Sequence, residues 1–507
     1  MPEVPVSVSK RDGRVEPFDA DKICQALFAA TETLGTPNAF LARELTDAVV
    51  HFLAADAGST QLATKDIAEQ VGKVVRELGH PGLAGGLAQA AAQKERAPSP
   101  NAPEARSPDE VMHPDEVVER CLETYTLQTV FTRDLAAAHR DGLIVLGGLE
   151  WPRRLDIVLA DMSGDLLQGL ADARVAAGFL VVVDGPEWLG IKRGIADSSV
   201  AWLQSLRDLL GRWVVVNVNS AEPPAWAHGG GSPLFPEPSL AHSANHQLLR
   251  ACIEAMRPAQ DELLWRWHVQ GRDFSAEPHA AILKEVAQRA LDGANLTFAF
   301  DRPRRPVALG DGMDRRHAAV LTEVGVNLPV LLNHPSVGGD LRTFLSKLPS
   351  LARMAVSAAG QRRKYLRDQA NLPSLSRGFL MDRAQCVTSV VGLDAVARTL
   401  SGQHIDEGPV ALELALTVLR TLHTALVDAA RLAHLGVAMD FTDVVRATPP
   451  AALKGRLITV GNLHAVGGSG TTNVVIPRQP AWSASDVVDL LAVAWKRTEI
   501  ASLGVSF

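Results

Sequence analysis

Four cations fall within thirteen positions near the N-terminus: Lys10, Arg11, Arg14 and Lys22. Lysine and arginine side chains supply positive charge and N–H donors for phosphate oxygens. The Asp12-Gly13 pair between extended residues predicts a tight turn, so the first three cations would lie on a hairpin. Lys22 would begin a helix, whose free N–H groups also favour an anion. The cluster therefore predicts phosphate binding, and a solvated charged hairpin is the alternative that charge content alone allows.

A small unit over residues 1–95 must hold these cations in place. Short extended runs flank the predicted turn, one up to Val8 and one from Val15 to Phe18. Apolar residues at helical spacing predict helices over residues 22–34, 39–54 and 65–78, followed by an Ala-rich helix over 82–94. The expected N-caps of the first three helices are Asp19 or Asp21, Asn38 and Thr64.

The order of residues in this unit resembles a known nucleotide-binding domain. The stretch from Val8 to Ile23 reads Val-x-Lys-Arg-Asp-Gly-Arg-x-x-x-Phe-x-x-x-Lys-Ile. Together with the three later helices it is similar to the ATP-cone domain, over about residues 5–95. Domains of this family stand at the N-terminus of many ribonucleotide reductases and in a transcriptional repressor of their genes. They bind ATP or dATP, often as an activity switch.

This resemblance implies a set of nucleotide-binding residues: Val8, Lys10, Arg11, Arg14, Lys22 and Thr64. The cations would lie at the phosphates, Val8 would border the base, and Thr64 would approach the nucleotide from the third helix. The expected effector is ATP or dATP, with Mg²⁺ as a candidate companion ion. The last helix departs from the family, because Leu83–Ala88 replaces larger or aromatic residues that are common there. The packing of the base is therefore outside this prediction.

The composition changes after residue 95. Residues 96–114 are rich in Pro, Ser and Ala without an apolar period, which predicts a linker. From residue 115 onward strand and helix patterns alternate, and this predicts an α/β barrel or a large doubly wound sheet. The expected strands are residues 143–146, 179–183, 213–218, 296–300, 321–326 and 387–391. The expected helices include residues 115–139, 243–256, 279–291, 341–369 and 411–435.

Five short stretches of this second part resemble anaerobic, glycyl-radical ribonucleoside-triphosphate reductases. In the order of that family they are His139–Ile144, Val216–Ser220, Val326–Pro329, Thr388–Asp394 and Gly470–Val474. The resemblance covers about residues 116–507 and implies a barrel of ten strands wrapped by helices. The expected fold class is thus α/β, with an ATP-cone over 1–95, a linker over 96–114 and a reductase-like α/β barrel over 115–507.

The residues that carry the radical chemistry of that family are missing from the matching positions. The family forms a thiyl radical on a finger-loop cysteine, generated by a C-terminal glycyl radical, and it has a second cysteine on the first strand and a four-cysteine zinc site. Here Gly310–His317 contains no cysteine, Gly147–Glu150 replaces His-Asp-Leu-Asp, and neither tyrosine follows a glycine. No glycyl-radical module is recognised before Phe507. We therefore predict no catalytic residues and no zinc site.

Other residues could take over some chemistry. Cys386 precedes an expected strand and is the best substitute thiol, although most buried cysteines are simply small apolar residues. Asp314 and His317 could do acid–base work. The clusters Arg302–Arg305 and Arg315–Arg316 could contact phosphates. For the last two groups an exposed charged loop is the plainer interpretation.

The sequence gives little indication of a hydrolase or of a metal site. The sequence contains no G-x-S-x-G, H-E-x-x-H, Walker A or dinucleotide fingerprint. His423 and His434 would lie on one helix, but eleven residues span about 16 Å, which is too far for a shared metal.

Composition excludes further classes. The 507 residues are 47% hydrophobic and 21% charged, as in soluble globular proteins. A net charge of -7 argues against a nucleic-acid-binding surface. No apolar run reaches the ~18 residues of a membrane helix, and the N-terminal residues have no signal core. The four scattered cysteines fit a reduced compartment. We predict a cytoplasmic protein with no nucleic acid or membrane partner.

The sequence thus predicts an ATP- or dATP-binding protein with a degenerate reductase-like barrel. It would act as a nucleotide-responsive regulatory protein or pseudoenzyme, as a homo-oligomer or with a reductase-related partner. Two alternatives stay open: a reductase component that relies on a separate radical subunit, and a transcriptional regulator that uses the cone as its sensor. No zinc ribbon or basic recognition helix supports the last alternative.

Overall fold

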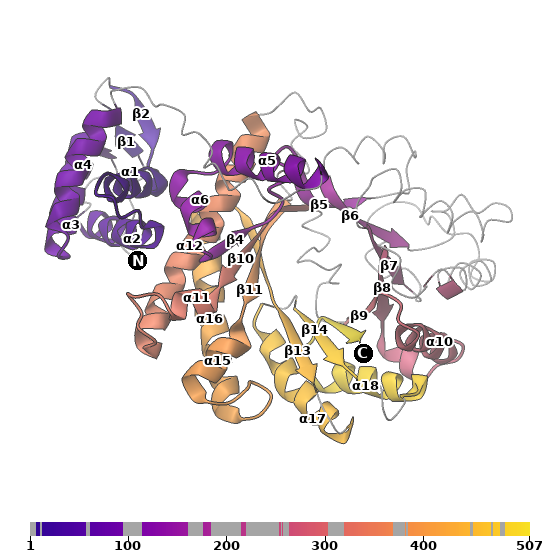
Figure 1. Cartoon of the computed structure of the whole chain (residues 1–507). Coiled ribbons are helices and arrows are strands. Elements are labelled where there is room, and N and C mark those ends of the chain that lie inside the picture. The colour runs from indigo at the N-terminus through magenta and orange to yellow at the C-terminus, as the bar shows by residue number, and fades with distance from the viewer. Residues whose placement is uncertain are drawn as a thin grey trace.

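The structure, a computed structural model, has two parts (Figure 1). The smaller part is N-terminal and lies at one side of a larger part built around a curved sheet. The structure describes residues 7–10, 13–56, 61–94, 114–160, 176–183, 214–219, 253–254, 256, 263–302, 319–368, 381, 384–446, 450–467, 470–476 and 482–506.

The smaller part, residues 7–94, is called the N-terminal unit. Its sheet has β1 (Ser7–Ser9) in the middle, antiparallel to β2 (Val15–Pro17) and parallel to β3 (Gln61–Ala63). The predicted hairpin is therefore confirmed. The helices, whose apolar faces form the core of the unit, are α1 (Ala20–Thr33), α2 (Ala39–Asp56), α3 (Thr64–Glu77) and α4 (Pro81–Lys94).

The helix starts of this unit confirm two of the three predicted caps. Asp19 caps α1, and its Oδ1 accepts a hydrogen bond from the N–H of Asp21 at 3.0 Å. The Oδ1 of Asn38 accepts one from the N–H of Leu41 at 2.9 Å, at the start of α2. The prediction for Thr64 as an N-cap was wrong. Thr64 is the first residue of α3, because its hydroxyl donates to a carbonyl of the sheet instead of capping its own helix.

The larger part is called the barrel. Its sheet contains, in the described part of the chain, twelve strands in the order β12-β11-β10-β5-β6-β7-β8-β9-β15-β14-β13, with β4 paired to β10 off this path. The two end strands are consecutive in sequence, separated by Phe441, so the sheet must curve back on itself. This confirms the predicted α/β barrel, and its sheet is mixed. We expected ten strands, and the count differs partly because the three-residue β4 adds a short strand beside the main path.

The strands of the barrel form parallel groups joined by antiparallel pairs, β5 with β10 and β9 with β15. Their bounds are β4 (Ile144–Leu146), β5 (Leu155–Ala160), β6 (Ala176–Val183), β7 (Val214–Asn219), β8 (Leu263–Val269), β9 (Leu296–Phe300), β10 (Ala319–Asn327), β11 (Ala384–Val391), β12 (Gly436–Asp440), β13 (Thr442–Arg446), β14 (Thr471–Val475) and β15 (Ser502–Ser506).

Helices cover the outside of this sheet. They are α5 (Pro114–Thr129), α6 (Arg133–Arg140), α10 (His279–Leu291), α11 (Leu328–Leu332), α12 (Leu341–Asp368), α15 (Leu393–Ser401), α16 (Pro409–Leu432), α17 (Pro450–Gly461) and α18 (Ala484–Arg497). The predicted helix over 279–291 and the strand over 296–300 match in full. Of the helix predicted over 243–256, residues 243–252 and 255 lie outside the described residues.

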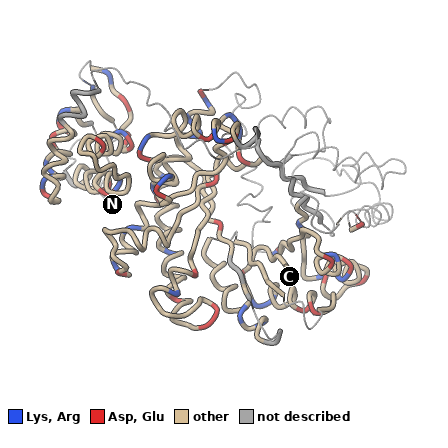
Figure 2. Tube along the Cα trace, viewed as in Figure 1, with Lys and Arg blue, Asp and Glu red and all other residues tan. Residues whose placement is uncertain are grey.

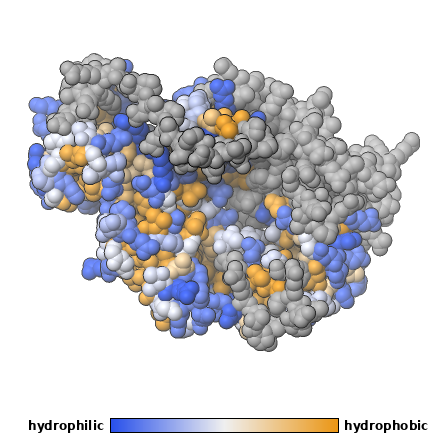
Figure 3. Space-filling view, in the orientation of Figure 1, coloured by the Kyte–Doolittle hydropathy of each residue, from blue (hydrophilic) through white to orange (hydrophobic). Residues whose placement is uncertain are grey.

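Two long helices, α12 and α16, pack against each other beside β10 and β11. By length and composition α16 could cross a membrane, but a core helix of a soluble protein passes the same test. Its residues Leu419, Leu422 and Leu426 are buried in the core. Its opposite side exposes Val410 and Leu432. Figure 3 shows apolar patches on the part of the barrel that lies next to the more hydrophilic N-terminal unit. One face of α16 thus packs in the core and the other is exposed.

Candidate nucleotide-binding site

The sheet of the N-terminal unit brings most of the predicted nucleotide-binding residues together. Val8 lies at the centre of β1, paired with Glu16 on one side and Leu62 on the other. Beyond the strand, the N–H of Lys10 donates to the carbonyl of Arg14 at 2.8 Å. These contacts close the turn, so both cations lie at the same end of the sheet.

Glu16 is the residue on which two predicted phosphate ligands converge. Its Oε2 lies 3.3 Å from the Nζ of Lys10 and 2.9 Å from the Nζ of Lys22. Hydrogen bonds from Lys22 and Lys10 lower the pKa of Glu16 below its ordinary value, so the carboxylate is ionised at neutral pH. The two ammonium groups are thus gathered around one anionic group, at the start of α1. A phosphate oxygen could take the place of that carboxylate.

Thr64 adds a third element to the site. Its hydroxyl donates to the carbonyl of Ser9 at 3.0 Å, directly before Lys10. The first turn of α3 is therefore fixed to the end of β1, and Thr64 lies near the lysine cluster as the resemblance implied. Arg11 lies outside the described residues. The structure thus groups Val8, Lys10, Arg14, Lys22 and Thr64 at one end of the unit, although their contacts with a nucleotide remain a prediction.

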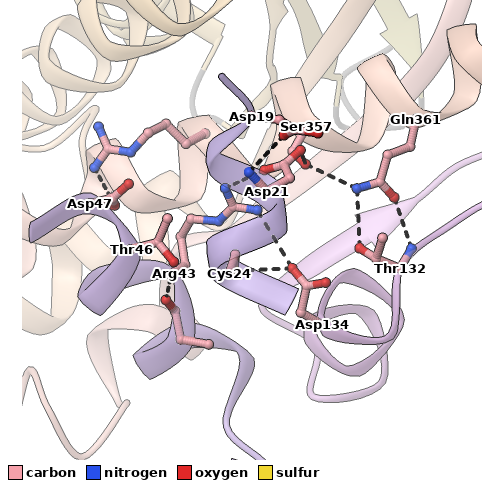
Figure 4. A network of polar contacts seen from close by, with 12 residues as sticks. Asp19, Asp21, Cys24, Arg43, Thr46, Asp47, Thr132, Asp134, Ser357 and Gln361 are labelled. Atoms are coloured by element: carbon pink, nitrogen blue, oxygen red, sulfur yellow. Dashed lines mark hydrogen bonds and ion pairs between the residues drawn. The ribbon is translucent and has the colours of Figure 1, made fainter. Parts of the chain in front are cut away.

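The N-terminal unit also docks on the barrel, through α1 and α2. Helices α1 and α2 contact α6 and α12, and Figure 4 shows the polar network between them. The side chains that the N-terminal unit contributes are four carboxylates and one guanidinium: Asp21, Glu32, Glu44, Asp47 and Arg43. The barrel contributes three cations and one carboxylate, namely Arg133, Lys347, Arg353 and Asp134. The two faces are therefore complementary in charge.

Arg43 is the centre of this interface. Its Nη1 donates to Asp21 at 2.8 Å, and its Nη2 lies 3.6 Å from Asp134. The side chains of Arg43 and Asp134 are only 3% and 4% exposed. Burial alone would lower the pKa of Arg43, but the neighbouring acidic groups raise it above its ordinary value. Arg43 is therefore charged, and it contacts one carboxylate on each side of the interface, Asp21 of the unit and Asp134 of the barrel.

One face of α12 carries the barrel side of this network. Ser357 donates to Asp21 at 2.6 Å, and Ser350 donates to Asp47 at 2.9 Å. Four residues after Ser357, Gln361 binds both Thr132 and Ser357. Figure 2 shows acidic as well as basic residues on the N-terminal unit, next to this part of the barrel. The unit is thus held by hydrogen bonds and ion pairs along a polar stripe of α12.

Some residues in the family-like stretches of the barrel have structural roles. Asn327 caps α11, since its Oδ1 accepts from the N–H of Val330 at 3.3 Å. Gly142 and Gly392 have φ of +74° and +78°, values that favour glycine at these turns. In β7, Asn217 pairs with Arg266 of β8. These contacts position the strands and do not by themselves define chemistry.

The described cysteines do not form a reactive site. Cys386 is fully buried within β11 and faces the carbonyl of Ala355 on α12, at 3.9 Å from its Sγ. Burial raises the pKa of Cys386 to about 12. Cys24 is also buried and donates to Asp134 at 3.3 Å, and burial raises its pKa. Cys121 is exposed on α5. Cys386 therefore occupies the position of a small apolar core residue.

Arg302 is committed to the fold. Its guanidinium donates to the carbonyls of Ala494 and Thr498 at 3.0 Å each, at the end of α18, and it stacks near the rings of Phe300 and Trp495. These contacts give the positive charge of Arg302 a structural role, so no bound phosphate is needed to explain it. The remaining predicted loop residues lie outside the described residues; they are Arg304, Arg305, Asp314, Arg315, Arg316 and His317.

Two polar pairs lie on the face of the barrel sheet that is turned away from the helices, called the inner face. Cys386 faces α12, so Ser389, three positions later on the same strand, faces the opposite way. There it hydrogen-bonds to the side chain of Glu323 of β10. Across the barrel, the Nδ1 of His268 lies 2.8 Å from the Oδ1 of Asp301, and both side chains are buried. No group of three or more His, Cys, Asp or Glu that could hold a metal occurs within the described ranges.

The fold and this site define a nucleotide-binding domain joined to a reductase-like barrel. Residues 6–87 match the ATP cone domain family. The N-terminal unit is therefore an ATP-cone, which confirms the resemblance seen in the sequence. None of the curated proteins compared with the chain matches it significantly.

Solved structures that the chain resembles include anaerobic ribonucleotide reductases. The enzyme from Thermotoga maritima in complex with dATP and CTP superimposes with a TM-score of 0.58 at 11% identity, over 77% of this chain and 82% of that one. The same enzyme with citrate in the active site gives 0.57 at 12% identity, over 77% and 90%. At this level of identity the likeness shows the fold, and it confirms the predicted barrel type.

The docking network is the part of the site that sequence reasoning missed. A signal for it exists in the helix predicted over 341–369, where polar residues recur three or four positions apart: Lys347, Ser350, Arg353, Ser357 and Gln361. Such a stripe on a core helix marks a polar face with a partner. The sequence could not say which partner, because the acceptors lie on α1 and α2, some 300 positions earlier.

Proposed function

We propose that the chain is a cytoplasmic, ATP- or dATP-responsive regulatory protein in which the ATP-cone controls a barrel that performs no radical reduction itself. The observation that carries the proposal is the convergence of Lys10 and Lys22 on Glu16 at the start of α1, with Thr64 at the start of α3 bonded to Ser9, next to Lys10. This arrangement offers two ammonium groups and helix N–H groups to a triphosphate. Mg²⁺ would accompany the nucleotide as a counter-ion.

The cysteine pattern supports the regulatory role. Radical reduction of the family's type needs a thiol that can contact the substrate. The stretch Gly310–His317 carries no cysteine, and Cys386 points into the protein interior toward α12. The barrel would then act as a nucleotide-responsive partner, within a homo-oligomer or together with a reductase-related protein.

A reductase component with a separate radical subunit is the second candidate. The polar pairs on the inner face, Glu323 with Ser389 and His268 with Asp301, favour it. The side chain of Glu323 is exposed and so is open to a ligand, whereas the carboxylate of Asp301 is buried beside His268. This candidate predicts that a nucleoside triphosphate binds to the barrel as well as to the ATP-cone.

Sedimentation of the full chain with and without nucleotide tests the regulatory proposal. We expect ATP or dATP to change the assembly state, and we expect Lys10→Ala/Arg14→Ala to abolish this response. If the chain binds ATP and dATP but its assembly state changes with neither, regulation through assembly is refuted. Retained binding in the double variant would instead indicate a second site in the barrel.

A further inference from the structure

One carboxylate lies at the point where the two lysines of the candidate nucleotide site meet. Glu16 is the middle residue of β2, and its Oε2 lies 2.9 Å from the Nζ of Lys22 and 3.3 Å from the Nζ of Lys10. Lys10 directly follows β1, and Lys22 lies in the first turn of α1. A single carboxylate oxygen therefore joins three elements of the ATP-cone, at the position predicted for a phosphate.

The two ammonium groups contact the same oxygen atom, so they lie close to each other. Like charges at such a separation repel each other, and the carboxylate between them offsets this repulsion. Hydrogen bonds from Lys22 and Lys10 lower the pKa of Glu16, so the carboxylate stays charged at neutral pH. The empty site thus holds an anion of its own, and the two lysines are already gathered around it.

Two other acidic residues lie close by in the sequence, but their carboxylates are engaged elsewhere. Asp19 caps α1 through the N–H of Asp21. The carboxylate of Asp21 accepts hydrogen bonds from Arg43 at 2.8 Å and from Ser357 at 2.6 Å. Within the described part of the chain, Glu16 is therefore the carboxylate that contacts both lysines of the site.

A triphosphate and the Glu16 carboxylate would compete for the same donors. The phosphate oxygens need the two ammonium groups, and a second anion beside Glu16 would be repelled by it. The side chain of Glu16 is 37% exposed, so its carboxylate can turn into water with little loss of hydration. Exposed ion pairs are individually weak, and a phosphate group, with up to about two negative charges, can replace them.

We propose that Glu16 is an internal competitor of the nucleotide: its carboxylate holds the phosphate position of the empty ATP-cone and leaves Lys10 and Lys22 when a triphosphate binds. This inference rests on the proposed function, because it requires that the phosphates contact these two lysines. The competitor lowers the affinity for every ligand that binds through its phosphates, since the same carboxylate leaves each time. Glu16 thus sets the nucleotide concentration at which the cone responds.

Inorganic tripolyphosphate separates this role from a contact with the nucleoside, because it has the phosphates without a base or a ribose. Binding of tripolyphosphate and of ATP to the full chain is measured by calorimetry at one ionic strength, since salt screens these contacts. Glu16→Gln and Glu16→Ala remove the charge of the competitor, and the alanine variant also lacks an amide that could donate to a phosphate. Glu77→Gln removes one charge at the exposed last position of α3, the opposite end of that helix from Thr64, and is the matched control.

We expect both Glu16 variants to bind tripolyphosphate about threefold or more tightly than the wild-type chain, and we expect Glu77→Gln to bind it as the wild type does. The inference is overturned if Glu16→Ala binds tripolyphosphate no more tightly than the wild type. It is also overturned if Glu77→Gln gains as much as Glu16→Ala, because the gain then reflects net charge alone.

The ATP titration keeps the failure of this inference apart from a failure of the proposed function. Saturable binding of ATP to the wild-type chain, lost in Lys10→Ala/Arg14→Ala, leaves the proposed function intact even where Glu16→Ala brings no gain. An absence of ATP binding to the folded wild-type chain would refute the proposed function, and the inference with it.

Discussion

The carboxylate of Asp21 accepts a 2.6 Å hydrogen bond from the hydroxyl of Ser357, 336 positions further along the chain. The next residue after Asp21 is Lys22, which shares Glu16 with Lys10. Figure 4 shows Asp21 between Arg43 and Ser357. The helix that begins the candidate nucleotide site is therefore also the helix that anchors the cone to the barrel.

Replacing Arg43 tests the buried charge at this interface. Arg43→Met leaves the carboxylate of Asp134, which is 4% exposed, without its cation. We expect the free energy of unfolding to fall by about 3–5 kcal/mol, measured by denaturant titration. The control Arg76→Met, at an exposed position of α3, should cost about 0.5 kcal/mol or less. Adding Asp134→Leu to Arg43→Met should recover part of the loss, and equal losses for both arginines would contradict the assigned role.

Two glycines allow the stability cost of a left-handed backbone to be measured separately from the cost of a steric clash. Gly148 and Gly338 have φ of +60° and +59°, but a Cβ would lie 2.2 Å from the Oδ1 of Asp156 at Gly148 and would meet nothing within 4 Å at Gly338. Gly338→Ala should cost about 1–2 kcal/mol for the left-handed backbone. Gly148→Ala should cost more, because Asp156 must move away from Arg362 and the N–H of Glu323. If both variants lose the same free energy of unfolding, the clash between the added Cβ at position 148 and Asp156 does not affect stability.

The stability of the chain should depend on the ionisation of Asp156. Burial raises the pKa of Asp156 from 3.8 to about 6, although Arg362 and the N–H of Glu323 act in the opposite direction. Because the folded pKa lies above the unfolded value, the protonated group favours the folded state, and this contribution is lost as pH rises from about 4 to about 6. Asp156→Asn should remove a pH-dependent loss of at most about 3 kcal/mol. Parallel pH profiles of unfolding for the two proteins would exclude this assignment.

Thiol labelling should distinguish the described cysteines. Cys121 is exposed, whereas Cys24 and Cys386 are buried, and burial raises the pKa of Cys386 to about 12. At pH 8 the thiolate fraction of Cys386 is about one part in ten thousand. Mass spectrometry should find maleimide on Cys121 within minutes, and on Cys24 and Cys386 only after unfolding. Fast labelling of Cys386 in the folded chain would reopen a reactive role for this thiol.

The sequence predicted elements well where one pattern dominated. The strand over 296–300 and the helix over 279–291 are uniformly patterned, and both match in full. The strand β8 was missed, because Arg266 and His268 interrupt its apolar run. The strand β5 was missed for the same reason, since Asp156 lies within it. Both strands carry buried polar residues whose partners become visible only in the fold.

The grouping of the candidate nucleotide-binding residues was largely predictable and the docking surface was not. Lys10, Arg14 and Lys22 lie within a short stretch, so local order and a family resemblance were enough to group them. Glu16 was overlooked as their common partner, although it lies in the same stretch. The pairing of Asp21 with Ser357 depends on how two parts far apart in sequence meet, and no local pattern contains that information.

Nucleotide binding by the full chain is the most direct measurement of the central claim. ATP and dATP are titrated separately by calorimetry into the wild-type chain and into Lys10→Ala/Arg14→Ala. We predict saturable binding to the wild type that disappears in the double variant, with a thermal stabilisation of about 2.7 kcal/mol at a hundred times the dissociation constant. Absence of heat and of stabilisation with both nucleotides, in a folded wild-type chain, would contradict the assignment of the ATP-cone as a nucleotide sensor.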